Sequence, residues 1–314
     1  MKKNADRNAF LEKMQFSFTY HDELLQADFT DYSLSMADTD FSARYSINKY
    51  PYNSVPLIEF TVKGQSSFGV CSGVVVGPHT VLTASHGMFP GGKTADNWEL
   101  FMRYSQNHYP DPDSPASVDG RSRIHYYNVG RDGTMTRAES EWDYAVINTK
   151  HKFNSWFGIM TEYSGGKAHM TGYPSTLHGV QQDTRGSVDR NSNYDVLDYL
   201  NFHAVGGNSG GPIWVDRDPG KGVEPYVVGL CSTTSWATLI TNDVLKQIRA
   251  WVKQDGYSFG RQAEQDHGRK VLAASEDDQF DFAAPAPAND NDGPIELDFG
   301  LPAIDDVASI LAGF

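Results

Sequence analysis

Cysteine is scarce in this chain: its 314 residues include only Cys71 and Cys231, too few for a disulfide framework. Apolar runs long enough to span a membrane are missing as well, so we expect no membrane partner. The formal net charge is −14, and no Lys or Arg follows Lys270. Because phosphate binding needs clustered basic side chains, we also expect no nucleic acid partner.

The chain divides into three regions, and the boundaries at residues 43 and 255 are those of the family resemblance given below. Residues 1–42 precede the first strand-like run, and we predict that they form an N-terminal extension or pro-segment. Residues 43–255 hold the strand-like runs and motifs, and we predict one folded domain there. Residues 256–314 are acidic and contain a stretch of Pro, Ala and Asn, which predicts a disordered C-terminal tail.

Short strand-like runs dominate the middle of the chain. They occupy residues 57–62, 144–148, 168–172, 212–215 and 226–230. Turns rich in Gly, Asn, Asp and Pro separate them, which is typical of an antiparallel barrel or sandwich. The one clear helical pattern follows Asn242, and its apolar face consists of Val244, Leu245, Ile248 and Trp251. We therefore predict an all-β fold with a closing C-terminal helix.

A serine lies among glycines in the run Gly-Gly-Asn-Ser-Gly-Gly-Pro at residues 206–212. Glycines let the backbone aim N–H groups into a common hollow, and no side chain obstructs a substrate carbonyl there. Ser209 is therefore a candidate nucleophile for acyl transfer, and the N–H groups of Gly207 and Ser209 are a candidate oxyanion hole. Alone, such a run is typical of an ordinary loop, so the prediction needs a base and an orienting acid.

Both groups precede this serine in the chain. His86 follows an apolar stretch that predicts two short strands around a Gly-Pro turn. Asp143 stands at the start of another apolar strand, where partial burial makes a carboxylate a good acceptor for an imidazole N–H. Each residue is commonplace by itself. Together, in the order His86, Asp143, Ser209, they predict a catalytic triad in the order of the chymotrypsin-like peptidases.

Three motifs carry a resemblance to the trypsin-like serine peptidases. Thr-Ala-Ser-His at residues 83–86, Trp-Asp-Tyr-Ala-Val at 142–146 and the glycine-rich run at 206–212 stand where that family has its triad motifs. Tyr-Pro-Tyr at 50–52, Thr-Gly-Tyr-Pro at 171–174 and Asn208 make the chain most similar to the bacterial branch that includes the glutamyl endopeptidases. The resemblance covers about residues 43–255 and makes this region a chymotrypsin-like serine peptidase domain.

The resemblance implies a fold and a reaction. The fold would be two six-stranded antiparallel Greek-key barrels with the active site between them and a closing C-terminal helix. The reaction would be hydrolysis of peptide bonds by a serine endopeptidase through an acyl-enzyme. We expect a monomer that acts on protein or peptide substrates, without cofactor or metal. The acidic loop with Asp111, Asp113 and Asp119 lacks the spacing of an EF-hand, and we interpret it as a solvated insertion.

The sequence departs from animal relatives at two places. Asn208 replaces the aspartate that captures a newly cut N-terminal amine, so activation by that ion pair is not expected. Gly87 stands at the position of the cysteine that would pair with Cys71, so that disulfide is missing. A bond between Cys71 and Cys231 stays open, because cysteines far apart in sequence need suitable geometry to pair.

The resemblance places the primary specificity pocket at five positions. They are His203, Ala204, Val205, Cys231 and Ser232. Ser232 also corresponds to the family's serine that supports the triad aspartate. A glutamyl endopeptidase has its carboxylate-binding histidine where this chain has Cys231, and no aspartate stands at the base to attract Arg or Lys. Either His203 faces the pocket and accepts acidic or polar side chains, or the pocket is an apolar slot, which we slightly favour.

Two other functions compete with this one. Gly-Asn-Ser-Gly-Gly at residues 207–211 also fits the nucleophile elbow of α/β-hydrolase esterases, but there a helix follows the serine, whereas residues 212–215 predict a strand. A catalytically idle peptidase homologue that serves as a protein-binding module is disfavoured, because all three triad residues are present.

The two ends of the chain bear on its location. Lys2 and Lys3 are followed by polar and charged residues and by no apolar segment, so an ordinary signal peptide is not expected. Residues 310–314 loosely resemble uncleaved C-terminal export signals of bacterial exoproteins, which favours secretion over a cytoplasmic location.

Overall fold

The computed structural model describes residues 47–62, 68–89, 93–104, 116–117, 123–175, 180–217, 224–259 and 295–296. All of them belong to one compact unit, residues 44–314. The predicted N-terminal extension, nearly all of the predicted tail and the acidic loop with Asp111, Asp113 and Asp119 lie outside the described residues. No helix in the described ranges is long and apolar enough to cross a membrane.

The described elements are mostly β-strands. The strands up to residue 148 are β1 (Leu57–Val62), β2 (Phe68–Ser72), β3 (Val74–Gly77), β4 (Thr80–Thr83), β5 (Ala95–Phe101), β6 (Ala116–Ser117), β7 (Ile124–His125), β8 (Thr134–Met135) and β9 (Ala145–Asn148). Those that follow are β10 (Gly158–Ile159), β11 (Gly165–Gly172), β12 (Gln182–Arg190), β13 (Val196–Tyr199), β14 (Pro212–Arg217), β15 (Glu224–Cys231), β16 (Trp236–Leu239) and β17 (Ile295–Glu296). The helices are η1 (Tyr52–Ser54), η2 (His86–Met88), α2 (Arg137–Ser140) and α3 (Asn242–Gln254).

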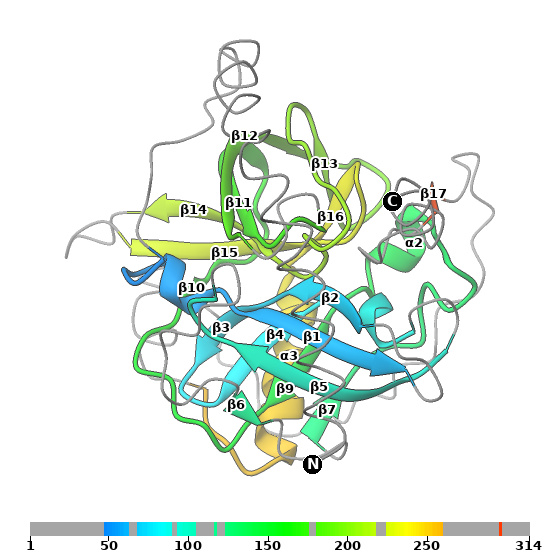
Figure 1. Ribbon diagram of the computed structural model, residues 1–314. Helices are drawn as coiled ribbons and strands as arrows, with labels where there is room; N and C mark the ends of the chain where they lie inside the picture. The colour runs from blue at the N-terminus through cyan, green and yellow to red at the C-terminus, as the bar shows by residue number, and fades with distance from the viewer. Residues whose placement is uncertain are drawn as a thin grey trace, which may run out of the picture. The chain divides into compact units, whose positions relative to one another are not determined.

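The second half of the domain is a closed antiparallel barrel (Figure 1). Its strands follow one another in the order β15, β14, β11, β12, β13 and β16, and β16 pairs back with β15. The short strand β10 adds to the outside of β15 in parallel. Closure leaves no free edge around the barrel, and β14 begins at Pro212, the last residue of the glycine-rich run. A strand after the serine excludes the α/β-hydrolase alternative.

The first half consists of two four-stranded sheets, in the orders β2-β1-β5-β6 and β3-β4-β9-β7. Only Gly73 separates β2 from β3, so one bent run of chain supplies a strand to each sheet. Within the described ranges no pairing joins β6 to β7, so this half consists of two sheets that the bent run of chain from β2 to β3 connects. The predicted all-β class with two β halves and a closing helix is confirmed.

Alternating side chains divide the core of the described residues into three large clusters, and a small fourth one holds Val129 and Met135. Ile58 and Phe60 of β1 point into the first half, whereas Leu57 packs in a cluster that also contains Trp214 and Val227 from the second half. A separate cluster fills the closed barrel. Neighbouring residues of a strand face opposite ways. One face of β1 therefore packs in the core of the first half, and the other packs in the cluster that contains residues of both halves.

The C-terminal helix α3 covers the first half next to β9 (Figure 1). Thr241 caps its N-terminus through Oγ1, which accepts from the Val244 N–H at 3.2 Å. Val244, Leu245 and Ile248 are buried as predicted, and Trp251 is half-buried against the Tyr144 ring. The predicted helix and its apolar face are therefore confirmed.

Candidate active site

His86 comes from the first half, where it opens η2 three residues after the end of β4. The residue before it fixes this turn: Ser85 Oγ donates to the Tyr144 carbonyl at 2.6 Å and accepts from the Tyr127 N–H at 3.0 Å. The His86 side chain is only 1 % exposed. The imidazole therefore has a fixed position and little contact with water.

Asp143 lies just after the single-turn helix α2 and is fully buried. Its carboxylate accepts three hydrogen bonds. The backbone N–H of His86 reaches Oδ1 at 2.8 Å, while His86 Nδ1 and the Ser232 hydroxyl reach Oδ2 at 2.7 and 2.6 Å. A buried carboxylate is costly unless it is paired in this way, so the carboxylate and the imidazole hold each other in place.

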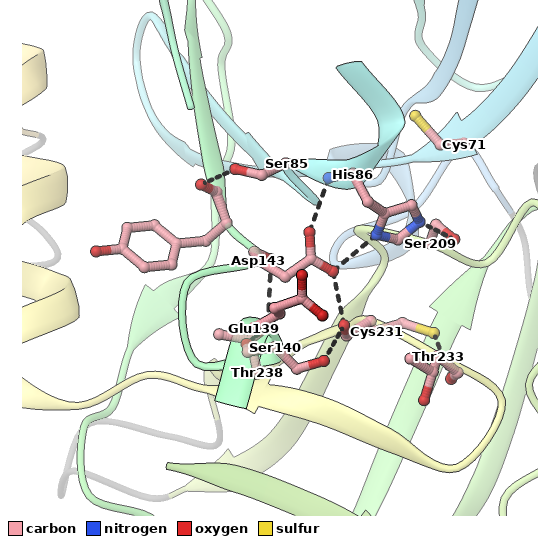
Figure 2. Close-up of polar contacts among 12 residues, drawn as sticks. Cys71, Ser85, His86, Glu139, Ser140, Asp143, Ser209, Cys231, Thr233 and Thr238 are labelled. Carbon is pink, nitrogen blue, oxygen red and sulfur yellow. Dashed lines mark hydrogen bonds and ion pairs between the residues drawn. The ribbon is translucent and has the colours of Figure 1, made fainter. Parts of the chain in front are cut away.

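These contacts assign the proton on His86. An ionised carboxylate only accepts hydrogen bonds, so Nδ1 carries the proton that it donates to Asp143. Nε2 is then an acceptor, and Ser209 Oγ lies 3.0 Å from it. Figure 2 shows Asp143, His86 and Ser209 joined in that order. The geometry lets Nε2 remove the hydroxyl proton of Ser209.

The loop that presents Ser209 requires glycine on both sides. Gly207 has φ +88° and Gly210 has φ +77°, in the left-handed region that side chains disfavour. A Cβ at Gly207 would overlap the Tyr173 carbonyl oxygen, and one at Gly210 would overlap Thr83 Oγ1. The glycines therefore allow both the backbone conformation and the close approach of neighbouring chain.

Ser72, the last residue of β2, holds this loop from the first half. Its N–H donates to the Ser209 carbonyl at 2.8 Å, and its hydroxyl donates to the Gly207 carbonyl at 2.8 Å. The same hydroxyl accepts from the Tyr173 N–H at 2.8 Å, and Ser72 is fully buried. Sequence reasoning missed Ser72, because no motif marks a contact between residues more than 130 positions apart.

The N–H groups of Gly207 and Ser209 have no acceptor within the part of the chain that the structure describes. The N–H groups of Asn208 and Gly210, which alternate with them, donate to backbone carbonyls at 3.1 and 2.7 Å. Backbone donors are usually paired when they are sheltered from water. Two unpaired donors beside the Ser209 hydroxyl are suited to an external oxygen atom, as the sequence predicted for an oxyanion hole.

A group of polar side chains supports Asp143. The Ser232 hydroxyl faces Asp143 Oδ2 at 2.6 Å and Ser140 Oγ at 2.9 Å. A hydroxyl has one proton, and the carboxylate is the nearer and stronger acceptor, so Ser232 donates mainly to Asp143. Trp236 Nε1 donates to Ser140 Oγ at 2.7 Å, and the Thr238 hydroxyl donates to the Ser140 carbonyl at 2.7 Å. Sequence reasoning found Ser232 by resemblance but had no signal for Ser140 or Trp236.

The other predicted pocket residues fall into two groups. Ala204 and Cys231 are buried in the apolar cluster of the closed barrel, and Val205 is half-buried. His203 is exposed. The structure therefore places Ala204 and Cys231 in the same apolar cluster and leaves His203 exposed. Ser232 is buried and faces Asp143.

Both cysteines are free, so the bond between Cys71 and Cys231 that the sequence left open is not formed. Each thiol is buried, which raises the pKa of Cys71 and of Cys231 to about 12. A Cβ at Gly87 would lie 3.6 Å from Cys71 Sγ. Gly87 therefore does occupy the place beside Cys71 where the resemblance expects a partner cysteine.

Comparisons with known proteins agree with this fold. No family model matches the chain. A curated relative, the "Extracellular metalloprotease" of Bacillus subtilis (strain 168), is 26% identical over 239 residues, which is 70% of each chain. The solved structure of a Glu endopeptidase in complex with MPD has a TM-score of 0.51 at 18% identity and covers 68% of this chain and 95% of its own.

A second solved structure, the protease Anisep from Arthrobacter nicotinovorans, has a TM-score of 0.50 at 18% identity and covers 65% of this chain and 98% of its own. These likenesses confirm, at the level of the fold, the predicted resemblance to chymotrypsin-fold bacterial proteases. The fold is thus shared with proteases that include a Glu endopeptidase.

The name of the Bacillus relative raises the question of a metal. Across the described ranges, no group of three or more His, Cys, Asp or Glu side chains could hold a metal ion. At the site itself, Asp143 and Ser209 already occupy both ring nitrogens of His86. The residues that surround Ser209 therefore do not fit a resident metal ion, and we derive no step through one.

Proposed function

We propose that this protein is a serine endopeptidase whose triad is His86, Asp143 and Ser209. The observation that carries the proposal is the pair of contacts at 2.7 Å between Asp143 and His86 Nδ1 and at 3.0 Å between His86 Nε2 and Ser209. The fold is shared with bacterial proteases, and the curated relative is named a protease. That relative is also named extracellular, so we further propose a secreted protein.

The reaction follows from the protonation states at the site. Nε2 of His86 takes the hydroxyl proton while Ser209 Oγ attacks a peptide carbonyl, and Asp143 stabilises the imidazolium that forms. The N–H groups of Gly207 and Ser209 receive the negative charge on the carbonyl oxygen. His86 then gives its proton to the leaving amine, which leaves an acyl group on Ser209. Water attacks this ester by the same route in reverse and frees the enzyme.

The test is Ser209→Ala, measured by casein hydrolysis and by labelling with a fluorophosphonate probe. We expect hydrolysis to fall by about 10⁶ in kcat, as in triads that act as a unit, and labelling to vanish while the fold is kept. Ser235→Ala is the matched control, because Ser235 is exposed and its side chain has no contact with the triad. Unchanged hydrolysis in Ser209→Ala would refute the proposal, and a tenfold loss would be too small for a nucleophile. A protein that binds peptides but neither cleaves them nor labels would favour the binding-module alternative.

A further inference from the structure

One short piece of the predicted C-terminal tail, β17, pairs with a strand of the folded domain. Ile295 lies opposite Met135 and Glu296 lies opposite Thr134, in an antiparallel register. β17 and β8 form a sheet of two strands, and among the described strands β8 has no other partner. A backbone edge of β8 is therefore occupied by the chain's own tail, and Figure 1 shows β17 beside α2.

The sequence that begins with β17 has the pattern of a strand. From Ile295 to Phe299, apolar residues alternate with acidic ones in the order Ile-Glu-Leu-Asp-Phe. Residues 283–293 come before it and consist of Ala, Pro, Asn, Asp and Gly, without any β-branched or aromatic residue. The strand pattern therefore begins at Ile295, the same residue at which the pairing with β8 begins.

β8 leads directly into the helical turn that precedes Asp143. Thr136 follows β8 and caps α2: its hydroxyl oxygen accepts from the Glu139 N–H at 3.2 Å, and Glu139 Oε2 accepts from the Thr136 N–H at 2.9 Å. α2 ends at Ser140, whose carbonyl accepts from the Asp143 N–H at 3.3 Å. The backbone of β8 is therefore connected to Asp143 by a single capped turn of helix.

Side chains anchor this loop to the domain. Met135 is fully buried beside Val129, and Tyr127 and Trp142 pack against them. Within the described part of the chain, β17 is what pairs with the backbone edge of β8. Loss of β17 would therefore leave the loop in place but open that edge to water, so the loop would gain freedom without unfolding.

We propose that β17 is a positioning segment for the active site: by adding a strand to β8, it holds the loop of Asp143 in the conformation that hydrogen-bonds His86. Strand addition is a general way in which an extended peptide binds a sheet edge through its backbone. The inference rests on the proposed function, because β17 acts through the triad carboxylate. Displacement of the tail from β8 then lowers the rate of the chemical step.

The test is the full-length double variant Ile295→Pro/Glu296→Pro. In an antiparallel pair, opposed residues alternate between those that exchange two hydrogen bonds and those that exchange none. Because proline has no N–H, changing both residues removes a backbone donor whichever pair is bonded. We expect kcat for one peptide substrate to fall about fivefold, the factor that one net hydrogen bond is worth, with KM unchanged. The rate of fluorophosphonate labelling falls by the same factor, because it also depends on His86 and Asp143.

Two controls separate the pairing from other effects. Ile295→Val/Glu296→Gln keeps both backbone donors and the strand pattern while it removes the charge, and we expect wild-type kcat. Phe280→Pro/Asp281→Pro also replaces an apolar and an acidic residue of the tail with proline but leaves β17 intact, and we expect wild-type kcat here as well. None of these variants changes a core residue, so the melting temperature stays that of the wild type.

Unchanged or higher kcat in Ile295→Pro/Glu296→Pro overturns the inference. So does an equal loss in either control, or a loss that appears in KM together with a lower melting temperature. Labelling of the wild type separates these outcomes from failure of the proposed function: with normal labelling they refute only the role of β17, whereas absent labelling refutes the triad.

Discussion

Replacing Trp236 with phenylalanine removes one N–H group from the support of Asp143 and keeps an aromatic ring under the guanidinium of Arg137, which lies 4.4 Å from the Trp236 ring centre. In the wild type the indole donates to Ser140 Oγ at 2.7 Å. That oxygen is also 2.9 Å from Ser232 Oγ. Without the indole donor, Ser140 Oγ becomes a better acceptor and competes with Asp143 for the one proton of Ser232.

The size of the effect follows from these contacts. A hydrogen bond to a charged group contributes about 1.5–3 kcal/mol, so Ser232→Ala, which removes the donor outright, costs about 10- to 150-fold in kcat/KM. Ser140 Oγ is a neutral competitor and can remove only part of the stabilisation that Ser232 gives to Asp143, because a hydrogen bond between neutral groups contributes about 0.5–1.5 kcal/mol. We therefore expect Trp236→Phe to lower kcat about fivefold, with KM unchanged.

The decisive measurement is the double variant Ser232→Ala/Trp236→Phe, assayed for kcat and KM with one peptide substrate. If Trp236 acts through Ser232, the double variant has the kcat of Ser232→Ala alone. Trp214→Phe is the control, since its indole donates at 2.9 Å to Thr171, which has no contact with Asp143. Losses that multiply in the double variant, or an equal loss in Trp214→Phe with the same fall in melting temperature, would refute this reasoning.

Three further predictions follow from the site and its surroundings. Gly87→Cys forms a disulfide with Cys71 that closes a loop of about 15 residues and adds about 3 kcal/mol to the free energy of unfolding under oxidising conditions. Thiol titration checks this, with Gly87→Ser as the control, and three titratable thiols in Gly87→Cys would contradict it. Trimming the chain near Arg44 and then acetylating the new amine leaves activity unchanged, because Asn208 cannot form an ion pair with that amine; a loss on acetylation would show the opposite. The free energy of unfolding falls as pH rises from 9 to 12, by about 1.4 kcal/mol per pH unit for each buried thiol, because the thiols of Cys71 and Cys231 ionise in the unfolded chain first. Urea titrations at pH 8 and pH 10 measure this fall. An equal or larger fall in the variant with both cysteines changed to alanine would contradict its assignment to the thiols.

The sequence predicted the parts of the molecule that local pattern determines. The apolar face of α3 and the strand that follows Ser209 were both found from periodicity and turn residues, and their positions agree with the structure. His86, Asp143 and Ser209 were found because each lies in a short motif, and the fold brings the three side chains together.

Other parts could not be predicted, because they depend on contacts between distant segments. Ser72 has no motif, and its importance appears only when β2 meets the loop of Ser209. The same holds for Ser140 and Trp236, which meet across 96 positions of sequence. The orientation of His203 was left open because one residue of difference in alignment decides whether it faces the pocket or the solvent.

The contacts of Ser72 have a consequence for protein engineering. The second barrel is closed by its own hydrogen bonds, yet the carbonyls of Gly207 and Ser209 take their donors from a residue of the first half. A chimera that joins this barrel to the first half of another protease therefore inherits a complete set of strands but an unanchored nucleophile. The barrel alone is therefore not a segment that can be swapped between such proteins. A recombination library should take Ser72 and residues 206–212 from the same parent.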